Sequence, residues 1–492
     1  MIRFIDFSFR YDGMPEDALK HINLEIKDGA FVLLTGRSGC GKSTILRALN
    51  GLIPHFYPGR TSGKLLYADR SLLEMNPSET AGIVGTVFQD PRSQFFMTDT
   101  TRELAFGCIN MGYTREEIID RVEKAVKELD LETFLNRSIF SLSSGEKQQI
   151  AIGSIYALSP DVYIFDEPSA NLDHEAIRRL TGILKKLREE GKTVIIADHR
   201  YYYLRDLIDC ALYIENGQIT AEFTREEFCR LDKAYRIQKG LRAVYPEKEI
   251  GDGFKKPADK GSNNKKQIFR VEGLSFSYGK GANVLDQISF EAASGDIVGI
   301  VGHNGAGKTT LISVLTGILK EKAGGVYYDG KKLSPAKRRK LSYLVMQDAD
   351  YQLFTASVEE ELVLGMTGVD RTLLDDTLDR LALSEYRDRH PASLSEGQKQ
   401  RVTIGASIMK NSKILYFDEP TSGLDHDSMI RVSGLIKDLS DNGAVIFLVS
   451  HDLEFIMNTC TDLLDLDPDQ AEMIKEPDIR SIHNYSFRAE NS

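Results

Sequence analysis

The segment AFVLLTGRSGCGKSTILRALNG, residues 30–51, sets the expected fold. An apolar run typical of a buried strand ends in glycines, and a helical stretch begins at Lys42 and Ser43. Glycines let the backbone curl so that several N–H groups point at phosphate oxygens, and a helix N-terminus adds partial positive charge. The lysine supplies a cation for the outer phosphates, and the hydroxyl can ligate Mg²⁺. The segment therefore predicts a phosphate-binding loop between a strand and a helix.

The chain repeats this segment and four others in the same order. GRSGCGKST at 36–44 returns as GHNGAGKTT at 302–310. The other pairs are VFQDPRSQFF (87–96) with VMQDADYQLF (345–354), SLSSGEKQQIAIG (141–153) with SLSEGQKQRVTIG (393–405), YIFDEPSANLD (163–173) with LYFDEPTSGLD (415–425), and ADHRYYYL (197–204) with VSHDLEFI (449–456). Ser143 and Asp166 are 23 positions apart, as are Ser395 and Asp418. The sequence therefore predicts two copies of one domain.

Each copy reads as an α/β domain. Continuous apolar runs such as TVIIADH (193–199) suit strands that are buried on both faces of a mainly parallel sheet. The stretch TREEIIDRVEKAVKELDL (114–131) has a helical pattern and predicts a small α-helical subdomain. We expect two tandem P-loop NTPase domains with these boundaries: 1–223 for the first domain, 224–267 for a connecting helical segment and flexible linker, 268–466 for the second domain, and 467–492 for a polar C-terminal tail.

Composition narrows the class of protein. The net charge of −11 disfavours a nucleic-acid partner, and five scattered cysteines among 492 residues predict reduced thiols in the cytosol. No apolar run approaches the roughly 20 residues that span a bilayer. The N-terminus MIRFIDFSFR lacks the apolar core of a signal peptide. These features exclude a lone transmembrane transporter and a secreted protein, and they leave a peripheral membrane partner open.

An acidic pair ends one apolar run in each copy. Asp166 follows VYIF and Asp418 follows ILYF, and Glu167 and Glu419 come next. A carboxylate at this place in a P-loop NTPase holds Mg²⁺, and the adjacent glutamate is the natural base for an attacking water.

The remaining motifs resemble those of ABC ATPases. LSSGE (142–146) and LSEGQ (394–398) resemble the signature sequence of that family and precede the acidic strand at the family's spacing. The resemblance also identifies Gln89 and Gln347 as Q-loop glutamines, 169–173 and 421–425 as D-loops, and His199 and His451 as switch histidines. Ser144, Glu146 and Glu396 depart from the usual signature.

The resemblance implies that two ATPase units pack head to tail, each ATP lying between one P-loop and the opposite signature. The expected ATP-binding residues are Gly36, Ser38, Gly39, Gly41, Lys42, Ser43, Thr44 and Gln89 with Ser395 and Gly397, and Gly302, Asn304, Gly305, Gly307, Lys308, Thr309, Thr310 and Gln347 with Ser143 and Gly145. The expected Mg²⁺ ligands are Ser43, Gln89, Asp166, Thr309, Gln347 and Asp418, and the expected catalytic residues are Glu167, Glu419, His199 and His451. Both copies are therefore expected to hydrolyse ATP.

Two tyrosines are further candidates. Tyr11 and Tyr278 each precede a P-loop lysine by about thirty residues and are expected to stack on adenine, or else to be core aromatics.

The stretches after the two Q-loop glutamines indicate a subgroup. QDPRSQFFMTDTTRELAFG (Gln89–Gly107) and QDADYQLFTASVEEELVLG (Gln347–Gly365) resemble the energy-coupling factor (ECF) ATPases of vitamin and transition-metal uptake, including cobalt-type importers. In that subgroup this region contacts a membrane permease, and a small membrane subunit binds the substrate. We therefore expect one fused chain per transporter, peripheral on the cytoplasmic face of the cell membrane. A soluble tandem ABC ATPase acting on ribosomes or DNA, and the ATPase of a sugar importer, are the alternatives.

Overall fold

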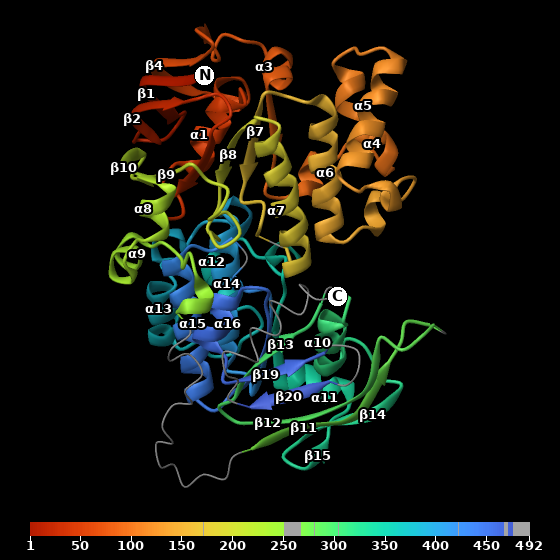
Figure 1. Cartoon of the computed structure of the whole chain (residues 1–492). Helices are drawn as coiled ribbons and strands as arrows, with labels where there is room; N and C mark the ends of the chain where they lie inside the picture. Colours follow the sequence, from red (N-terminus) through yellow and green to blue (C-terminus); the bar gives the residue numbers. More distant parts are fainter. Residues whose placement is uncertain are drawn as a thin grey trace. The chain divides into compact units, whose positions relative to one another are not determined.

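The computed structural model describes residues 1–170, 172–249, 267–279, 281–303, 305–421, 423–466 and 471–475. The chain divides into two compact units, Met1–Val244 and Tyr245–Ser492 (Figure 1). Residues 224–244, which were expected to connect the domains, pack into the first unit, where Phe228 and Leu241 are buried. Residues 250–266 of the expected connecting segment and linker, 224–267, lie outside the described residues.

The first unit is built on a six-stranded sheet of order β10-β9-β3-β8-β7-β6. Only the edge strand β10 runs antiparallel to its neighbour, and β3 and β8 are buried along their whole length. The strands are β3 (Phe31–Thr35), β6 (Val84–Val87), β7 (Val162–Asp166), β8 (Thr193–Ala197), β9 (Cys210–Glu215) and β10 (Gln218–Thr224). The P-loop follows the carboxyl end of β3, the acidic pair stands at the end of β7, and the switch histidine follows β8. Ligand sites of parallel sheets lie at these ends of the strands.

A second, antiparallel sheet was not predicted. It has the order β2-β1-β4-β5, with β1 (Ile2–Tyr11), β2 (Leu19–Ile26), β4 (Gly59–Tyr67) and β5 (Arg70–Ser71). Phe7 and Phe9 of β1 belong to the same hydrophobic core as Ile45 and Leu49 of helix α1 (Lys42–Leu49). This core brings the end of β1 next to the helix that follows the P-loop.

Helices form the rest of the first unit. The predicted helical subdomain is present as α4 (Thr100–Asn110), α5 (Arg115–Glu128) and α6 (Ser144–Leu158), which pack on one another. The others are α2 (Leu52–His55), α3 (Pro77–Ile83), α7 (His174–Glu189), α8 (Arg225–Cys229) and α9 (Lys233–Lys239).

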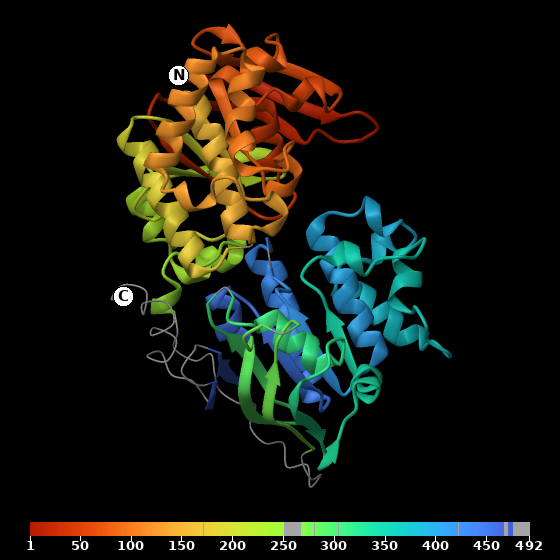
Figure 2. The ribbon, with the colours of Figure 1, turned by 90° about the vertical axis from the view of Figure 1, so that its right-hand side faces the viewer.

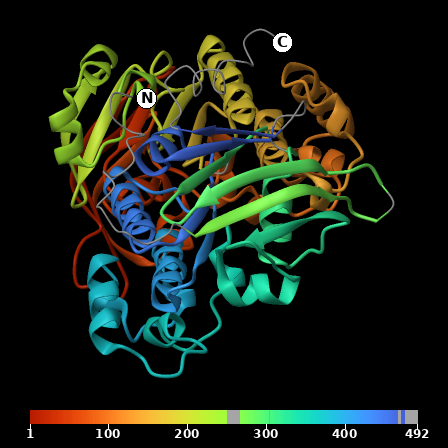
Figure 3. The same cartoon turned by 90° about the horizontal axis from the view of Figure 1, so that it is seen from below.

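The second unit repeats this plan. Its larger sheet has the order β16-β17-β18-β13-β19-β20 and its antiparallel sheet the order β12-β11-β14-β15. Figure 3 shows the long strands β11 and β12 (green) of the antiparallel sheet from below. The strands are β11 (Ile268–Phe276), β12 (Leu285–Ala293), β13 (Ile297–Val301), β14 (Ala323–Tyr328), β15 (Lys331–Lys332), β16 (Ser342–Val345), β17 (Ile414–Asp418), β18 (Val445–Val449), β19 (Asp462–Asp465) and β20 (Glu472–Lys475). Strand β20 falls within the expected polar tail and pairs with β19.

The helices of the second unit also follow the first. They are α10 (Lys308–Thr316), α11 (Pro335–Leu341), α12 (Val358–Leu362), α13 (Arg371–Arg380), α14 (Glu396–Lys410), α15 (His426–Asp441) and α16 (Leu453–Thr459). Figure 2 shows the helical subdomain (teal and blue) at one side of this unit, away from the antiparallel strands β11 and β12 (green). The predicted fold class, two tandem α/β P-loop domains, is confirmed. Within the described residues, no helix has both the length and the apolar character needed to cross a membrane.

Candidate nucleotide-binding and hydrolysis site

The P-loop of the first unit connects β3 to α1. Gly36 and Gly41 have φ angles of 141° and 115°, which favour glycine. A Cβ atom on Gly36 would lie 2.2 Å from the carbonyl oxygen of Ile214. The amine of Lys42 is enclosed by the loop and donates to the carbonyls of Gly36 (2.9 Å) and Arg37 (3.1 Å). The loop thus holds a buried cation at a helix N-terminus, which is suited to phosphate.

A hydroxyl and a carboxylate meet beside this loop. The Ser43 hydroxyl donates to Asp166 Oδ1 at 3.2 Å. Burial, and next the charge of Glu167, raise the pKa of Asp166 to about 6. No group of three potential His, Cys, Asp or Glu ligands occurs among the described residues. One hydroxyl with one carboxylate still fits Mg²⁺, which binds nucleotide sites mainly through substrate phosphates and water.

The predicted glutamine, glutamate and histidine of the first unit meet at Glu167. Gln89 Nε2 donates to Glu167 Oε2 at 3.1 Å, and His199 Nε2 lies 3.5 Å from Glu167 Oε1. Glu167 has a φ of 46°, a left-handed conformation that is strained for this residue type, and its N–H donates to the carbonyl of Ala197. The backbone therefore fixes the carboxylate between two side chains from distant parts of the chain.

The second unit reproduces most of this arrangement. Lys308 donates to the carbonyls of Gly302 (2.7 Å) and His303 (2.9 Å). Asp418 accepts a hydrogen bond from Thr309, and burial raises its pKa. Asn304 lies outside the described residues.

The glutamates of the two units differ in their neighbours. Glu419 also has a left-handed φ of 50°, and His451 Nε2 lies 3.7 Å from its Oε1. Gln347, however, is exposed and, in the part of the chain that the structure describes, forms no hydrogen bond with Glu419. Gln400 instead donates to the backbone carbonyl of Glu419 at 2.8 Å. The two copies are therefore chemically similar but not identical.

The signature serines begin helices. Ser143 and Ser395 are exposed N-cap residues of α6 and α14. The unusual Glu146 accepts from the Ser143 N–H at 2.7 Å, and Gln398 accepts from the Ser395 N–H at 2.9 Å. Glutamate therefore closes the same capping box as glutamine at this position.

The two tyrosines lie next to predicted nucleotide residues. The hydroxyl of Tyr11 is 3.2 Å from Thr44 Oγ1, and that of Tyr278 is 3.3 Å from Thr310 Oγ1. Both tyrosines thus stand at the first turn of the helix that follows a P-loop.

Sequence reasoning missed a buried carboxylate beside the first switch histidine. Asp198 accepts from the Ser169 hydroxyl (2.9 Å), the His199 N–H (2.6 Å) and the Tyr203 hydroxyl (2.5 Å). Arg200 donates to the carbonyl of Ser169 at 3.2 Å. One carboxylate therefore ties the D-loop to the switch histidine. An acidic residue at the end of the apolar run TVIIA was the available signal.

Each of the two segments predicted to contact a permease exposes a phenylalanine that the sequence did not single out. Phe96 and Phe354 are 72% and 75% exposed. The buried Glu103 accepts from the Phe96 N–H at 3.1 Å, and the buried Glu361 accepts from the Phe354 N–H at 2.8 Å. In both units a buried carboxylate therefore holds a loop in which a large apolar ring faces solvent.

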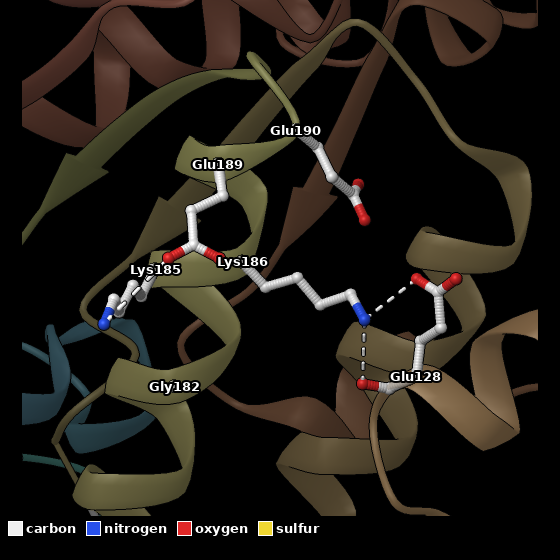
Figure 4. A pocket seen from close by; sticks show the side chains of 6 residues that line it. All are labelled: Glu128, Gly182, Lys185, Lys186, Glu189 and Glu190. Carbon is white, nitrogen blue, oxygen red and sulfur yellow. Dashed lines mark hydrogen bonds and ion pairs between the residues drawn. The ribbon is translucent and has the colours of Figure 1, made fainter.

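An open pocket of about 480 Å³ lies at the end of α7 and is lined by none of the predicted nucleotide residues (Figure 4). Lys186 Nζ contacts Glu128 Oε2 at 2.9 Å there, joining α7 to the end of α5. Arg380 and Asp438 form the counterpart ion pair of the second unit at the same positions of the repeat, with the charges reversed. The retained pairing indicates that each unit depends on an attraction between its helical subdomain and its core.

We expect Lys186→Asp to destabilise the first unit by about 1 kcal/mol, because it places two carboxylates together in a partly exposed contact. Combining it with Glu128→Arg should recover most of the loss, since the double variant copies the polarity of the second unit. A double-mutant cycle measured by urea denaturation checks this. Additive losses in the double variant would contradict the pairing.

Comparison with known proteins identifies the family. A family model described as ABC transporter matches residues 19–170 and 285–422, more than half of the chain. A protein of Treponema denticola named "Putative ABC transporter ATP-binding protein" is 42% identical over 466 residues, covering 95% of each chain. A protein of the same name from Methanosarcina acetivorans is 31% identical, covering 92% of this chain and 82% of its own.

Solved structures agree with the fold. A chain described as RNase-L Inhibitor has a TM-score of 0.66 at 22% identity, covering 98% of this chain and 92% of its own. An archaeal ribosome recycling factor has a TM-score of 0.63 at 22% identity, covering 97% of each chain. At these identities the likeness shows the fold alone.

Together, the fold and the matches define a protein with two ATP-binding ABC domains in tandem. The chain belongs to the ABC transporter family, and its domains bind and hydrolyse ATP.

Proposed function

We propose that the chain is the ATP-hydrolysing subunit of an ECF-type importer, which takes up a vitamin or a transition-metal ion. The observation that carries the proposal is the Q-loop segment, which has the same construction in both units. In this account the chain lies on the cytoplasmic face of the membrane, one copy per transporter, against a permease and a small substrate-binding membrane subunit.

The chemistry of each site is assigned to residues of one unit and the signature of the other. Lys42 moves from its two carbonyl partners to the outer phosphates, and Ser395 and Gly397 of the opposite signature cover the γ-phosphate. Lys308 takes the same part with Ser143 and Gly145. An exposed serine at a helix N-terminus is suited to this task, because it offers a hydroxyl and unpaired N–H groups to an anion.

Glu167 and Glu419 are assigned the orientation and deprotonation of the attacking water. His199 and His451 lie beside these carboxylates and are assigned contact with the γ-phosphate. Ser43 with Asp166, and Thr309 with Asp418, would hold Mg²⁺, assisted by Gln89 and Gln347. The metal would neutralise charge on the phosphates that leave and transfer. The rings of Tyr11 and Tyr278 are assigned to adenine.

The docking surface for the permease is assigned to the two Q-loop segments. Phe96 and Phe354 stand at the same position of the two loops and are each about three-quarters exposed, so a partner that covered them would gain the burial of two large apolar rings. Gln94 and Gln352 fold back on their own loops, where each accepts from a backbone N–H, of Phe88 and Met346 respectively. The polar residues of the pattern thus brace the loop, and Phe96 and Phe354 are left to enter an apolar site on the partner.

Replacing Phe96 and Phe354 together by serine is expected to release the chain from membranes while leaving the ATPase rate of the purified chain within about twofold. Neither residue is among the predicted nucleotide residues, and each substitution removes apolar area that a partner would bury. The measurement is the amount of chain that co-purifies with membranes of its native cells. Ile119→Ser, an exposed change on α5, is the matched control and should stay bound.

The same fractionation tests the alternatives. Recovery with ribosomes and not with membranes would contradict the transport proposal and favour a ribosome-acting ATPase. Recovery with the membrane proteins of a sugar importer would keep transport and contradict the ECF assignment.

A further inference from the structure

The first unit surrounds Tyr11 with a cluster of side chains that the second unit has only in part. Arg47, on α1, donates to the Tyr11 hydroxyl at 3.1 Å. Its guanidinium carbon lies 4.4 Å from the centroid of the Tyr57 ring, a cation–π contact. The Tyr57 ring in turn meets Tyr11 edge to face, with centroids 6.2 Å apart. Phe9 packs on Tyr11 as well, with centroids 4.8 Å apart.

The second unit has only part of this cluster. Phe276 packs on Tyr278 with centroids 5.0 Å apart, as Phe9 does on Tyr11. The position of Arg47 is taken by Ser313, whose hydroxyl donates to the Thr309 carbonyl of its own helix. The loop that carries Tyr57 is shorter in the second unit, where ILKEKA (318–323) contains no aromatic residue. Tyr278 is consequently 60% exposed, whereas Tyr11 is half-buried.

The difference affects how much freedom each ring loses when a base stacks on it. A ring that is already held by its hydroxyl and its edge loses little rotamer freedom when a base stacks on it. Because ordering a mobile side chain opposes binding, holding the ring in advance raises the affinity by about three- to tenfold. Tyr278 has its hydroxyl contact with Thr310 but no cation or second ring against it in the described part of the chain. The longer loop of the first unit therefore has a structural use, since it supplies the ring on which Arg47 rests.

We propose that Arg47 and Tyr57 are positioning residues that hold Tyr11 ready for adenine, which makes the first ATP site the tighter of the two. The proposal rests on the stacking of Tyr11 on adenine put forward above. Neither Arg47 nor Tyr57 is assigned a contact with phosphate or a step in hydrolysis.

Binding measurements on the full chain test this. The parent for all variants carries Lys308→Ala, so that the first site dominates, and Glu167→Gln, so that ATP is not consumed. Arg47→Ser, which copies the second unit, is expected to weaken ATP binding about three- to tenfold. Competition by inorganic tripolyphosphate, which has no base, should be unchanged. Equal weakening of both ligands would overturn the proposal, because Arg47 would then act on phosphate.

Further variants separate the possible causes. Tyr57→Ala should weaken ATP binding as Arg47→Ser does, whereas Tyr57→Phe keeps the ring and should bind normally. Ser313→Ala is the matched control and should leave the first site unchanged.

If Tyr11→Ala leaves ATP affinity unchanged, adenine stacking itself is wrong. If Tyr11→Ala weakens ATP binding and Arg47→Ser does not, only the present inference is wrong. Tyr57 is exposed, so its variants remain informative if Arg47→Ser destabilises the unit.

Discussion

Replacing both Glu167 and Glu419 by glutamine is expected to lower ATP turnover by about a hundredfold or more, which is the usual contribution of a general base. Glutamine keeps the size of the side chain and its contacts with Gln89 and His199, but it cannot take a proton. ATP binding should therefore persist while phosphate release stops. Steady-state release of phosphate, together with the amount of ATP bound, measures both effects.

The single variants show whether both copies hydrolyse ATP. Each is expected to remove the turnover of its own site, since each glutamate has a switch histidine within 3.7 Å. Glu175→Gln is the matched control, because it makes the same chemical change on an exposed turn of α7 and should leave the rate unchanged. If Glu419→Gln also left the rate unchanged, the second copy would bind ATP without hydrolysing it.

The sequence alone predicted the elements whose chemistry is local. Gly36 and Gly302 favour glycine because both have φ angles in the left-handed range, and a Cβ atom would lie 2.2 Å from the carbonyl oxygen of Ile214 at Gly36 and 3.1 Å from the Cβ of Ala306 at Gly302. A lysine and a hydroxyl must follow at fixed positions to reach the same phosphates. Such constraints produce a recognisable sequence motif, and finding the motif twice in the chain strengthened the prediction.

The antiparallel sheet left no such pattern. In β1 the buried residues are Ile2, Phe4, Phe7, Ser8 and Phe9, and the pairing with β2 shifts register between Phe4 and Phe7 and again between Phe7 and Phe9. The shifts break the strict alternation by which a half-buried strand is recognised. The counterpart strand β11 shifts its register in the same way, beside Gly273 with a φ of 54°.

Contacts between distant side chains were equally hidden. Asp198 and Ser169 are 29 positions apart, and neither sequence segment predicts the hydrogen bond between them. Gln89 and Gln347 stand in the same motif, yet among the described residues only the first forms a hydrogen bond with its glutamate. Motifs predict which residue types are present at a site, whereas the packing of each copy decides which of them touch.

The second large effect concerns which P-loop and which signature sequence bind the same ATP. If each ATP is held by one P-loop and the opposite signature, Lys42 and Ser395 serve the same site, whereas Lys42 and Ser143 serve different ones. Combining Lys42→Ala with Ser395→Arg should then disable one site, and combining Lys42→Ala with Ser143→Arg should disable both. Removing a serine N-cap costs about 1 kcal/mol, so circular dichroism must show that each variant is folded.

The most direct measurement is the ATP that stays bound to the chain through gel filtration, in the Glu167→Gln, Glu419→Gln background. We expect two ATP molecules per parent chain, one in the Lys42→Ala, Ser395→Arg chain, and none in the Lys42→Ala, Ser143→Arg chain. The opposite order, with ATP lost from the first combination and retained by the second, would contradict the claim that each copy completes the site of the other.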